Sequence, residues 1–382
     1  MESSIGNLEA GNGSNKFNKE PLPAKLNAWV DGKLPDAVDD GEQQIIEAGE
    51  AKYHRLGWKG LTVMLIVEAI GLGSLSIPSA FASLGMVAGV ICCVGIGLIA
   101  IYTSYVIGQV KLAFPAVRDY GDAGALLMGT WGRELFTFML ILQLIFLTGS
   151  NCLTGTIALR HITSSGICSV VWSVVSANIV FAYTFASCLF SFMDEMHTPK
   201  EFTKSIWSLG ILQIVIYTVT GATIYAFVGV DVQSPALLSA GTLVSKVAFG
   251  IALPVIFISG AICTIVAGRL IHGRIYANSV TKYINTPKGW ITWLTVITIL
   301  TIISWVIAEA IPFFDDLLSI TSALFTSGFS FYLPPIMWYV LIRKGPWYSK
   351  ENLLTSLVNL FVFIFGLVVL VGGLYSSIQD IV

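Results

Sequence analysis

An acid, small polar residues and a proline interrupt the first strongly apolar stretch of this chain. The interruption contains, in order, Glu68, Gly71, Leu72, Gly73, Ser74 and Pro78. Glycine and proline weaken a helix, and lipid supplies no replacement hydrogen bonds. We therefore expect the helix to unwind at residues 71–74. The freed backbone N–H groups, and the positive end of the half-helix that follows, would suit a substrate carboxylate.

The same residues have a plainer interpretation as a helix-packing surface, because small residues let membrane helices approach closely. Glu68 also leaves two possibilities open. An ionised carboxylate is costly inside a membrane, so this acid should be neutral, paired or in contact with water. A neutral carboxylic acid could exchange a proton during a transport cycle, or it could simply bond a neighbouring helix. Glu68 is therefore a candidate for proton coupling.

A second interruption is expected within residues 178–188, which mix aromatic, small and polar side chains. The candidate binding residues there are Phe181, Ala182, Tyr183 and Thr184. An apolar, aromatic lining suits neutral substrate side chains. The alternative is that these are ordinary lipid-facing or core aromatics. Interrupted membrane helices are typical of the substrate sites of secondary transporters.

Composition excludes most other classes of function. The 382 residues are 55% hydrophobic and 12% charged, whereas soluble proteins are about 25% charged. The net charge of −2 gives no sign of nucleic-acid binding. The chain has no Walker loop and no cluster of metal-ligating residues, so we expect neither an enzyme nor a cofactor or metal. The hydroxyls of Ser259 and Thr264 could ligate sodium, although bonds to their own helix are the simpler expectation.

Nine apolar segments are long enough to cross a bilayer. They are 59–80, 84–110, 134–158, 164–193, 203–229, 243–268, 290–311, 314–342 and 353–378. With a cytoplasmic N-terminus, only Arg160 and Lys246 of the 21 Lys and Arg residues fall outside. This asymmetry follows the positive-inside rule and supports both the number of spans and the orientation. Residues 1–58 are polar and are expected to form a disordered cytoplasmic tail.

Several long strings indicate a family. They are EAIGLGSLSIP at 68–78, FASLG at 81–85, SFMDEM at 191–196, DVQSPALL at 231–238 and AEAIPFF at 308–314. With them, residues 56–378 resemble the amino acid/auxin permease family and, within it, fungal neutral amino acid permeases. The resemblance implies an all-α membrane transporter with about eleven spans on a five-plus-five inverted-repeat core. It also implies proton symport, usually across the plasma membrane, with vacuolar relatives. Backbone groups at residues 71–74 and 181–184 would hold the substrate.

The chain departs from that family pattern after residue 177. The first repeat (59–177) is short by roughly 45 residues, about two crossings of some 20 residues each. The second repeat (178–342) and an extra C-terminal helix (353–378) are expected to be complete within the transporter domain 59–378. The sequence thus predicts a proton-coupled importer of neutral amino acids. The alternative is a non-transporting membrane protein, either a transporter-derived nutrient receptor or an inactive shortened variant.

Overall fold

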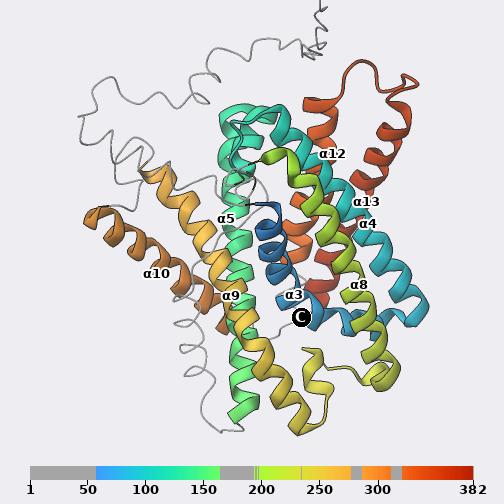
Figure 1. The fold of residues 1–382 in the computed structure, drawn as a ribbon, viewed down its shortest axis with the longest axis vertical. Helices are drawn as coiled ribbons and strands as arrows, with labels where there is room; N and C mark the ends of the chain where they lie inside the picture. The colour runs from blue at the N-terminus through green and yellow to red at the C-terminus, as the bar shows by residue number, and fades with distance from the viewer. Residues whose placement is uncertain are drawn as a thin grey trace, which may run out of the picture. The chain divides into compact units, whose positions relative to one another are not determined.

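The computed structural model describes residues 57–163, 193, 196, 198–233, 235–276, 286–310 and 321–381, without the side chains of 68–73 and 376–381. The regular elements in these ranges are all helices (Figure 1). The α-helices are α3 (Trp58–Leu84), α4 (Met86–Ala113), α5 (Tyr120–Thr163), α8 (Phe202–Val228), α9 (Thr242–Ile275), α10 (Pro287–Ala310), α12 (Leu333–Met337) and α13 (Leu353–Ile381). The 3₁₀ helices are η1 (Pro199–Glu201), η2 (Gly229–Asp231) and η3 (Ala236–Ser239). Three π-helical turns, η5 (Ser322–Thr326), η6 (Gly328–Tyr332) and η7 (Trp338–Ile342), flank α12.

The expected all-α membrane fold is confirmed. Seven helical segments in the described ranges are long and apolar enough to cross a membrane. The helix α3 has 27 residues, which at 1.5 Å per residue is also sufficient. Eight of the nine expected spans therefore overlap helices, and the ninth, 164–193, lies outside the described residues except for Met193. The expected tail also lies there, apart from its last two residues. The repeat boundaries stay predictions.

The interruption expected at residues 71–74 is wrong, because α3 is one α-helix from Trp58 to Leu84. Direct packing by neighbouring helices explains how the helix persists through weak helix formers. The ring of Phe81 lies against Gly89 of α4 and Gly221 of α8, where an added Cβ would meet it at 2.8 Å and 2.7 Å. The hydroxyl of Ser79 donates to the carbonyl of Ser76 at 2.8 Å, so it needs no partner outside the helix.

The helix α5 is a tight helical hairpin. Its φ of 70° and ψ of −152° at Gly129 lie in a region that side-chain-bearing residues avoid. Residues 120–128, which we call the inner arm, fold back there onto the beginning of residues 130–163. The backbones touch at two glycines, since a Cβ added to Gly124 would lie 2.5 Å from the carbonyl oxygen of Gly132. The hairpin explains why α5 begins well before the expected span of 134–158.

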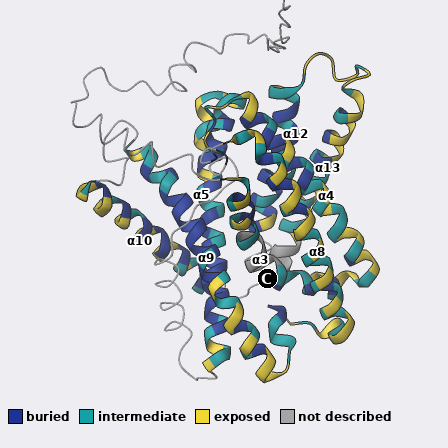
Figure 2. Ribbon diagram, in the orientation of Figure 1, coloured by how far each residue is buried: buried dark blue, intermediate teal, exposed yellow. Residues whose placement is uncertain are grey.

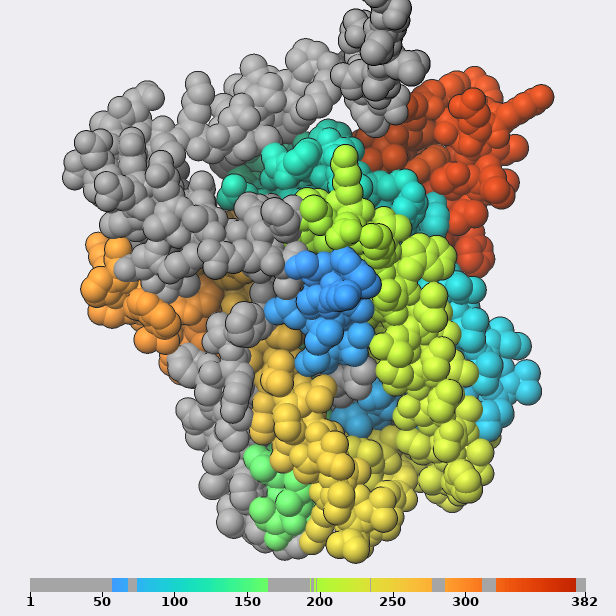
Figure 3. Space-filling model, viewed as in Figure 1, coloured from blue at the N-terminus to red at the C-terminus, as the bar shows by residue number. Residues whose placement is uncertain are grey.

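Six of the long helices form two packed groups, while α13 packs against η5, η6 and α12. The first contains α3, α4 and α8, and the second contains α5, α9 and α10, with α3 also packing against α9. Burial is concentrated in the second group (Figure 2). In the most apolar 18-residue stretch of α9, 61% is buried. In that of Pro199–Asp231, which includes α8, only 6% is buried. The helix α8 therefore presents most of its apolar surface outward, as a lipid-facing helix does. Residues of α3 reach the surface between α8 and α9 (Figure 3).

Candidate functional site

Four helices meet at one apolar cluster. The cluster contains Leu75 of α3, Cys152 and Leu153 of α5, Ile256, Phe257 and Ala261 of α9, and Ala308 of α10. The close approach of α5 and α10 depends on Gly149, because a Cβ there would lie 3.0 Å from the carbonyl oxygen of Ser304. The cluster therefore brings the second half of α3 against the middle of the second helix group.

Buried hydroxyl groups lie next to this cluster on the same helices. The hydroxyls of Thr148 on α5 and Thr264 on α9 are 3.2 Å apart. Each also lies within hydrogen-bond distance of a carbonyl of its own helix, Thr148 of Leu144 at 2.9 Å and Thr264 of Gly260 at 3.0 Å. Because a hydroxyl has a single proton, one of the two donates to its helix and accepts from the other. Ser304 of α10 is also buried. These residues, with Asn151, form what we call the polar belt.

Asn151 is the member of the belt with unused hydrogen-bonding capacity. Its side chain is 0% exposed, and its amide nitrogen donates to the carbonyl of Leu147 at 2.9 Å. Its oxygen Oδ1 is buried and has no hydrogen-bond partner among the residues that the structure describes. Leaving a carbonyl oxygen unpaired in a buried position costs about 1–3 kcal/mol. Such an oxygen can accept a hydrogen bond from a bound ligand, and no existing hydrogen bond has to be broken first.

The belt carries no charge. Residues 140–158 of α5, 250–268 of α9 and 295–308 of α10 contain no Asp, Glu, Lys or Arg. Glu309, the nearest acid along α10, is half-buried at the end of that helix. An uncharged polar centre within an apolar surround can bind a zwitterion, whose net charge is zero, more easily than a ligand with net charge.

Of the expected site residues, the structure describes the side chain of Ser74 alone. The side chains of Glu68, Gly71, Leu72 and Gly73 are among those not described, and all of Phe181, Ala182, Tyr183 and Thr184 lies outside the described residues. Ser74 is half-buried, directly before Leu75 of the four-helix cluster. The glycine segment of α3 thus directly precedes Leu75, a residue of the apolar cluster beside the polar belt.

The alternative interpretation of Thr264 is confirmed, because its hydroxyl bonds the carbonyl of Gly260 within its own helix. Ser259 is buried on the same helix. In the ranges the structure describes, no group of three His, Cys, Asp or Glu residues could hold a metal ion.

Sequence reasoning missed Thr148 and Asn151. Their signal is the small polar run from Thr148 to Asn151 inside a long apolar stretch. Taken alone, such a run is equally typical of helix–helix packing. Only the burial of all four residues, and the unpaired oxygen of Asn151, marks this run as a candidate binding surface.

Comparison with known proteins gives a consistent result. A family model described as "Transmembrane amino acid transporter protein" matches residues 54–179 and 170–379. The chain is 48% identical to an "N amino acid transport system protein" of Neurospora crassa over 421 aligned positions, covering 91% of this chain and 89% of that protein. It is 23% identical to a "Transmembrane transporter" of Fusarium pseudograminearum over 424 positions, with the same coverage of each. A "Transmembrane transporter" of Gibberella moniliformis is also 23% identical, over 397 positions covering 85% of this chain and 84% of that protein.

Proposed function

The chain belongs to the transmembrane amino acid transporter family, and from that premise we propose that it imports neutral amino acids by proton symport. The observation that carries the choice of substrate is the uncharged polar belt at the centre of the second helix group. A charged substrate side chain would have to leave water without an opposite charge to meet it, which is costly in a membrane interior. A neutral zwitterion needs only donors and acceptors for its two end groups.

Asn151 is the proposed acceptor for the substrate ammonium. Its buried Oδ1 is free to accept, and an ammonium group offers three donors. We place the substrate between this oxygen and the glycine segment of α3, with Gly71, Leu72, Gly73 and Ser74 allowing close approach. Phe181, Ala182, Tyr183 and Thr184 are the proposed lining for the substrate side chain. Glu68 is the proposed proton-exchanging acid.

The two helix groups support a mechanism of alternating access. In such a mechanism one group rocks against the other around a site near the bilayer midplane. Here the group of α5, α9 and α10 carries the polar belt, and α3 belongs to the other group while packing on α9. We propose a cytoplasmic N-terminus from the distribution of Lys and Arg, and a location in the plasma membrane.

Replacing Gly71 by valine is expected to abolish uptake while leaving the amount of protein at the cell surface normal. The added branched side chain would occupy the space that the substrate needs beside α3. The measurement is uptake of a radiolabelled amino acid together with surface labelling. Gly95→Val on α4 is the matched control, since nothing lies within 4 Å of a Cβ added there. Normal uptake by Gly71→Val would remove residues 71–74 from the site.

Uptake is expected to be independent of sodium, and Thr264→Val should leave that independence unchanged. The hydroxyl of Thr264 already bonds Gly260 and Thr148, so its loss should cost only about 0.5–1.5 kcal/mol of stability. The measurement is uptake in sodium chloride and in choline chloride. Uptake that requires sodium in the parent protein and loses this requirement in Thr264→Val would point to a sodium site instead.

A second candidate function, a membrane protein that does not transport, has one observation in its favour. Ninety-one per cent of 382 residues is about 348, so about 73 of the 421 positions aligned with the Neurospora protein have no counterpart here. The same calculation gives about 76 and 72 positions for the other two relatives. The family match is also split into two segments that overlap at 170–179. The positions without a counterpart thus outnumber the roughly 45 residues expected, and the split of the family match supports placing the difference near residues 170–179.

Restoring that segment separates the two candidate functions. The missing stretch of the Neurospora protein would be inserted at 170–179, and the uptake of the extended and natural chains would be compared at equal surface amount. Uptake by both chains supports transport by the natural chain. Uptake by the extended chain alone identifies the natural chain as an inactive shortened variant, and uptake by neither favours a receptor.

A further inference from the structure

We propose that the inner arm is a proton-controlled latch between the two helix groups, and that Asp119, directly before the arm, is the group that takes the proton. The latch would be strengthened when the cytoplasmic side becomes acidic. The proposal rests on the proposed transport function for its consequence, but its structural part can be tested without any transport assay.

The inner arm touches helices of both groups, because its Tyr120 and Ala123 belong to one buried cluster with residues of α4 and α9. The cluster includes Ile107 and Val110 of α4 and Val266 and Ala267 of α9. Its first residue, Tyr120, donates a hydrogen bond to the carbonyl of Phe329 in η6 at 3.1 Å, and the two rings lie 4.6 Å apart. Lys111, near the end of α4, donates to the carbonyl of Val117 at 2.6 Å. The connection that leads into the arm is therefore fixed to α4 of the first group. The arm itself is the first part of α5, in the second group, and it packs on the rest of that helix where Gly124 meets Gly132.

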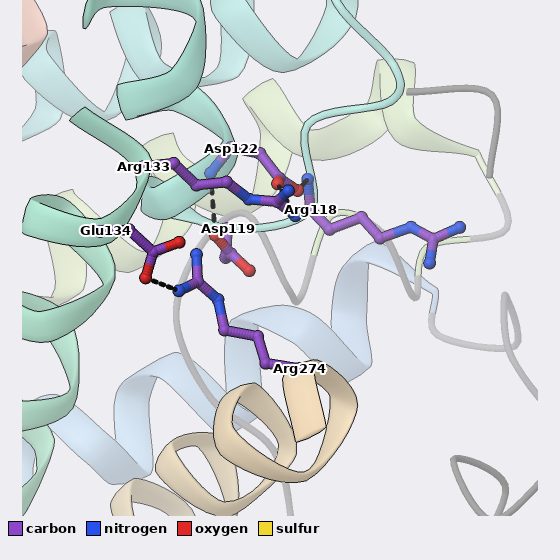
Figure 4. A network of polar contacts seen from close by, with 6 residues as sticks. All are labelled: Arg118, Asp119, Asp122, Arg133, Glu134 and Arg274. Carbon is purple, nitrogen blue, oxygen red and sulfur yellow. Dashed lines mark hydrogen bonds and ion pairs between the residues drawn. The ribbon is translucent and has the colours of Figure 1, made fainter. Parts of the chain in front are cut away.

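Three acids and two arginines form the charged cluster around the arm (Figure 4). Arg133 pairs with Asp122 at 3.1 Å, and Arg274 of α9 pairs with Glu134 at 2.8 Å. Asp119 lies between the two pairs and is the third carboxylate, without an arginine of its own in the described part of the chain. Its Oδ1 accepts a hydrogen bond from the backbone N–H of Asp122 at 3.0 Å. Asp119 thus caps the first turn of the arm.

This surplus carboxylate is the group that should bind a proton. Burial, with a further contribution from the charge of Asp122, raises the pKa of Asp119 from 3.8 to about 6, while Arg274 opposes the rise. The other charged groups around it are Arg133 and Glu134 of α5 and Arg118, whose side chain points away from the cluster (Figure 4). Lys111 of α4 donates to the carbonyl of Val117, two residues before Asp119.

The raised pKa of Asp119 determines how the stability of the arm changes with pH. Because the folded arm binds this proton more tightly than the unfolded chain does, the contribution of Asp119 to stability decreases as the pH rises from 3.8 through about 6. Above that value the ionised carboxylate repels Asp122 and the arm is held less firmly. Acidification of the cytoplasm therefore tightens the arm. A tighter link between the helix groups slows their relative movement, so a proton-coupled importer would be slowed as protons accumulate inside.

Hydrogen–deuterium exchange tests the latch directly. The full chain in lipid nanodiscs would be compared at pH 5 and pH 7, one unit on either side of about 6, after correction for the intrinsic pH dependence of exchange. Residues 120–137 should be better protected at pH 5. Asp119→Asn keeps the oxygen that caps the arm but cannot ionise, so its protection should be high at both values. Asp119→Glu, which can ionise, should restore the difference, and Glu351→Gln, an exposed residue of a loop on the same side, should behave as the parent protein.

Equal protection of the parent protein at both pH values would overturn the proposal, as would an unchanged pH difference in Asp119→Asn. Initial uptake rates at saturating substrate provide the second readout. The ratio of the parent rate to the Asp119→Asn rate should exceed one at inner pH 7 and approach one at inner pH 5. If the parent protein takes up nothing at either pH, the proposed function fails, while the exchange result still decides whether the latch exists.

Discussion

Replacing Asn151 by leucine is expected to lower uptake sharply and at the same time to stabilise the protein. The buried oxygen of Asn151 has no partner in the described part of the chain, and removing an unpaired buried acceptor recovers part of the about 1–3 kcal/mol that it costs. Leucine has the same branching at Cγ and the same number of heavy atoms, and it favours a helix. The same change removes the proposed acceptor for the substrate ammonium, so uptake should fall at least about tenfold, which corresponds to about 1.4 kcal/mol of lost binding.

The opposite directions of the two effects make this variant informative. A residue that serves only packing should lose stability and uptake together. The matched control is Ser150→Ala, because the hydroxyl of Ser150 is also buried but donates to the carbonyl of Phe146 in its own helix at 3.0 Å. This control should keep near-normal uptake. Thermal unfolding in detergent and radiolabelled uptake at equal surface amount provide the two measurements, and full uptake by Asn151→Leu would exclude Asn151 from the site.

Replacing Gly132 by valine is expected to damage the fold itself. A Cβ at this position would lie 2.5 Å from the carbonyl oxygen of Gly124 and 2.6 Å from the Cβ of Met128. The oxygen is a backbone atom that cannot rotate away, so the hairpin of α5 must open. Overpacking of this kind costs about 1–3 kcal/mol, and we expect the midpoint of thermal unfolding to fall by about 2–6 °C.

The control for this prediction is Gly250→Val on α9. Gly250 is also helical, and nothing lies within 4 Å of a Cβ added there. Both variants place a β-branched residue in a helix, so only the contact between the two arms of the hairpin differs. Equal losses of stability in the two variants would show that this contact contributes nothing.

Hydropathy predicted the membrane helices well because lipid imposes the same requirement on every crossing. The expected spans 203–229 and 290–311 differ from α8 (Phe202–Val228) and α10 (Pro287–Ala310) by at most three residues at either end. Hydropathy did not reveal the inner arm, because residues 120–128 contain charge and glycine and are not continuously apolar. The positive φ of Gly129 and the contact of Gly124 with Gly132 are tertiary features.

The expected break in α3 was wrong for a related reason. Composition measures how weakly residues 71–78 favour a helix, but the neighbours that pack on Phe81 and Leu75 decide the backbone shape. Asn151 was missed because a one-dimensional pattern cannot show which polar atoms lack partners. The interruption near Phe181 stays a prediction, since that residue lies outside the described part of the chain.

Uptake by purified protein in liposomes tests the central claim most directly. A panel of neutral, acidic and basic radiolabelled amino acids would be offered with and without an inwardly directed proton gradient, with Asn151→Leu as the paired negative variant. We predict concentrative uptake of neutral amino acids only when the gradient is present, and little uptake of charged ones. Gradient-independent uptake, preference for charged substrates, or the absence of uptake from every member of the panel would contradict this account.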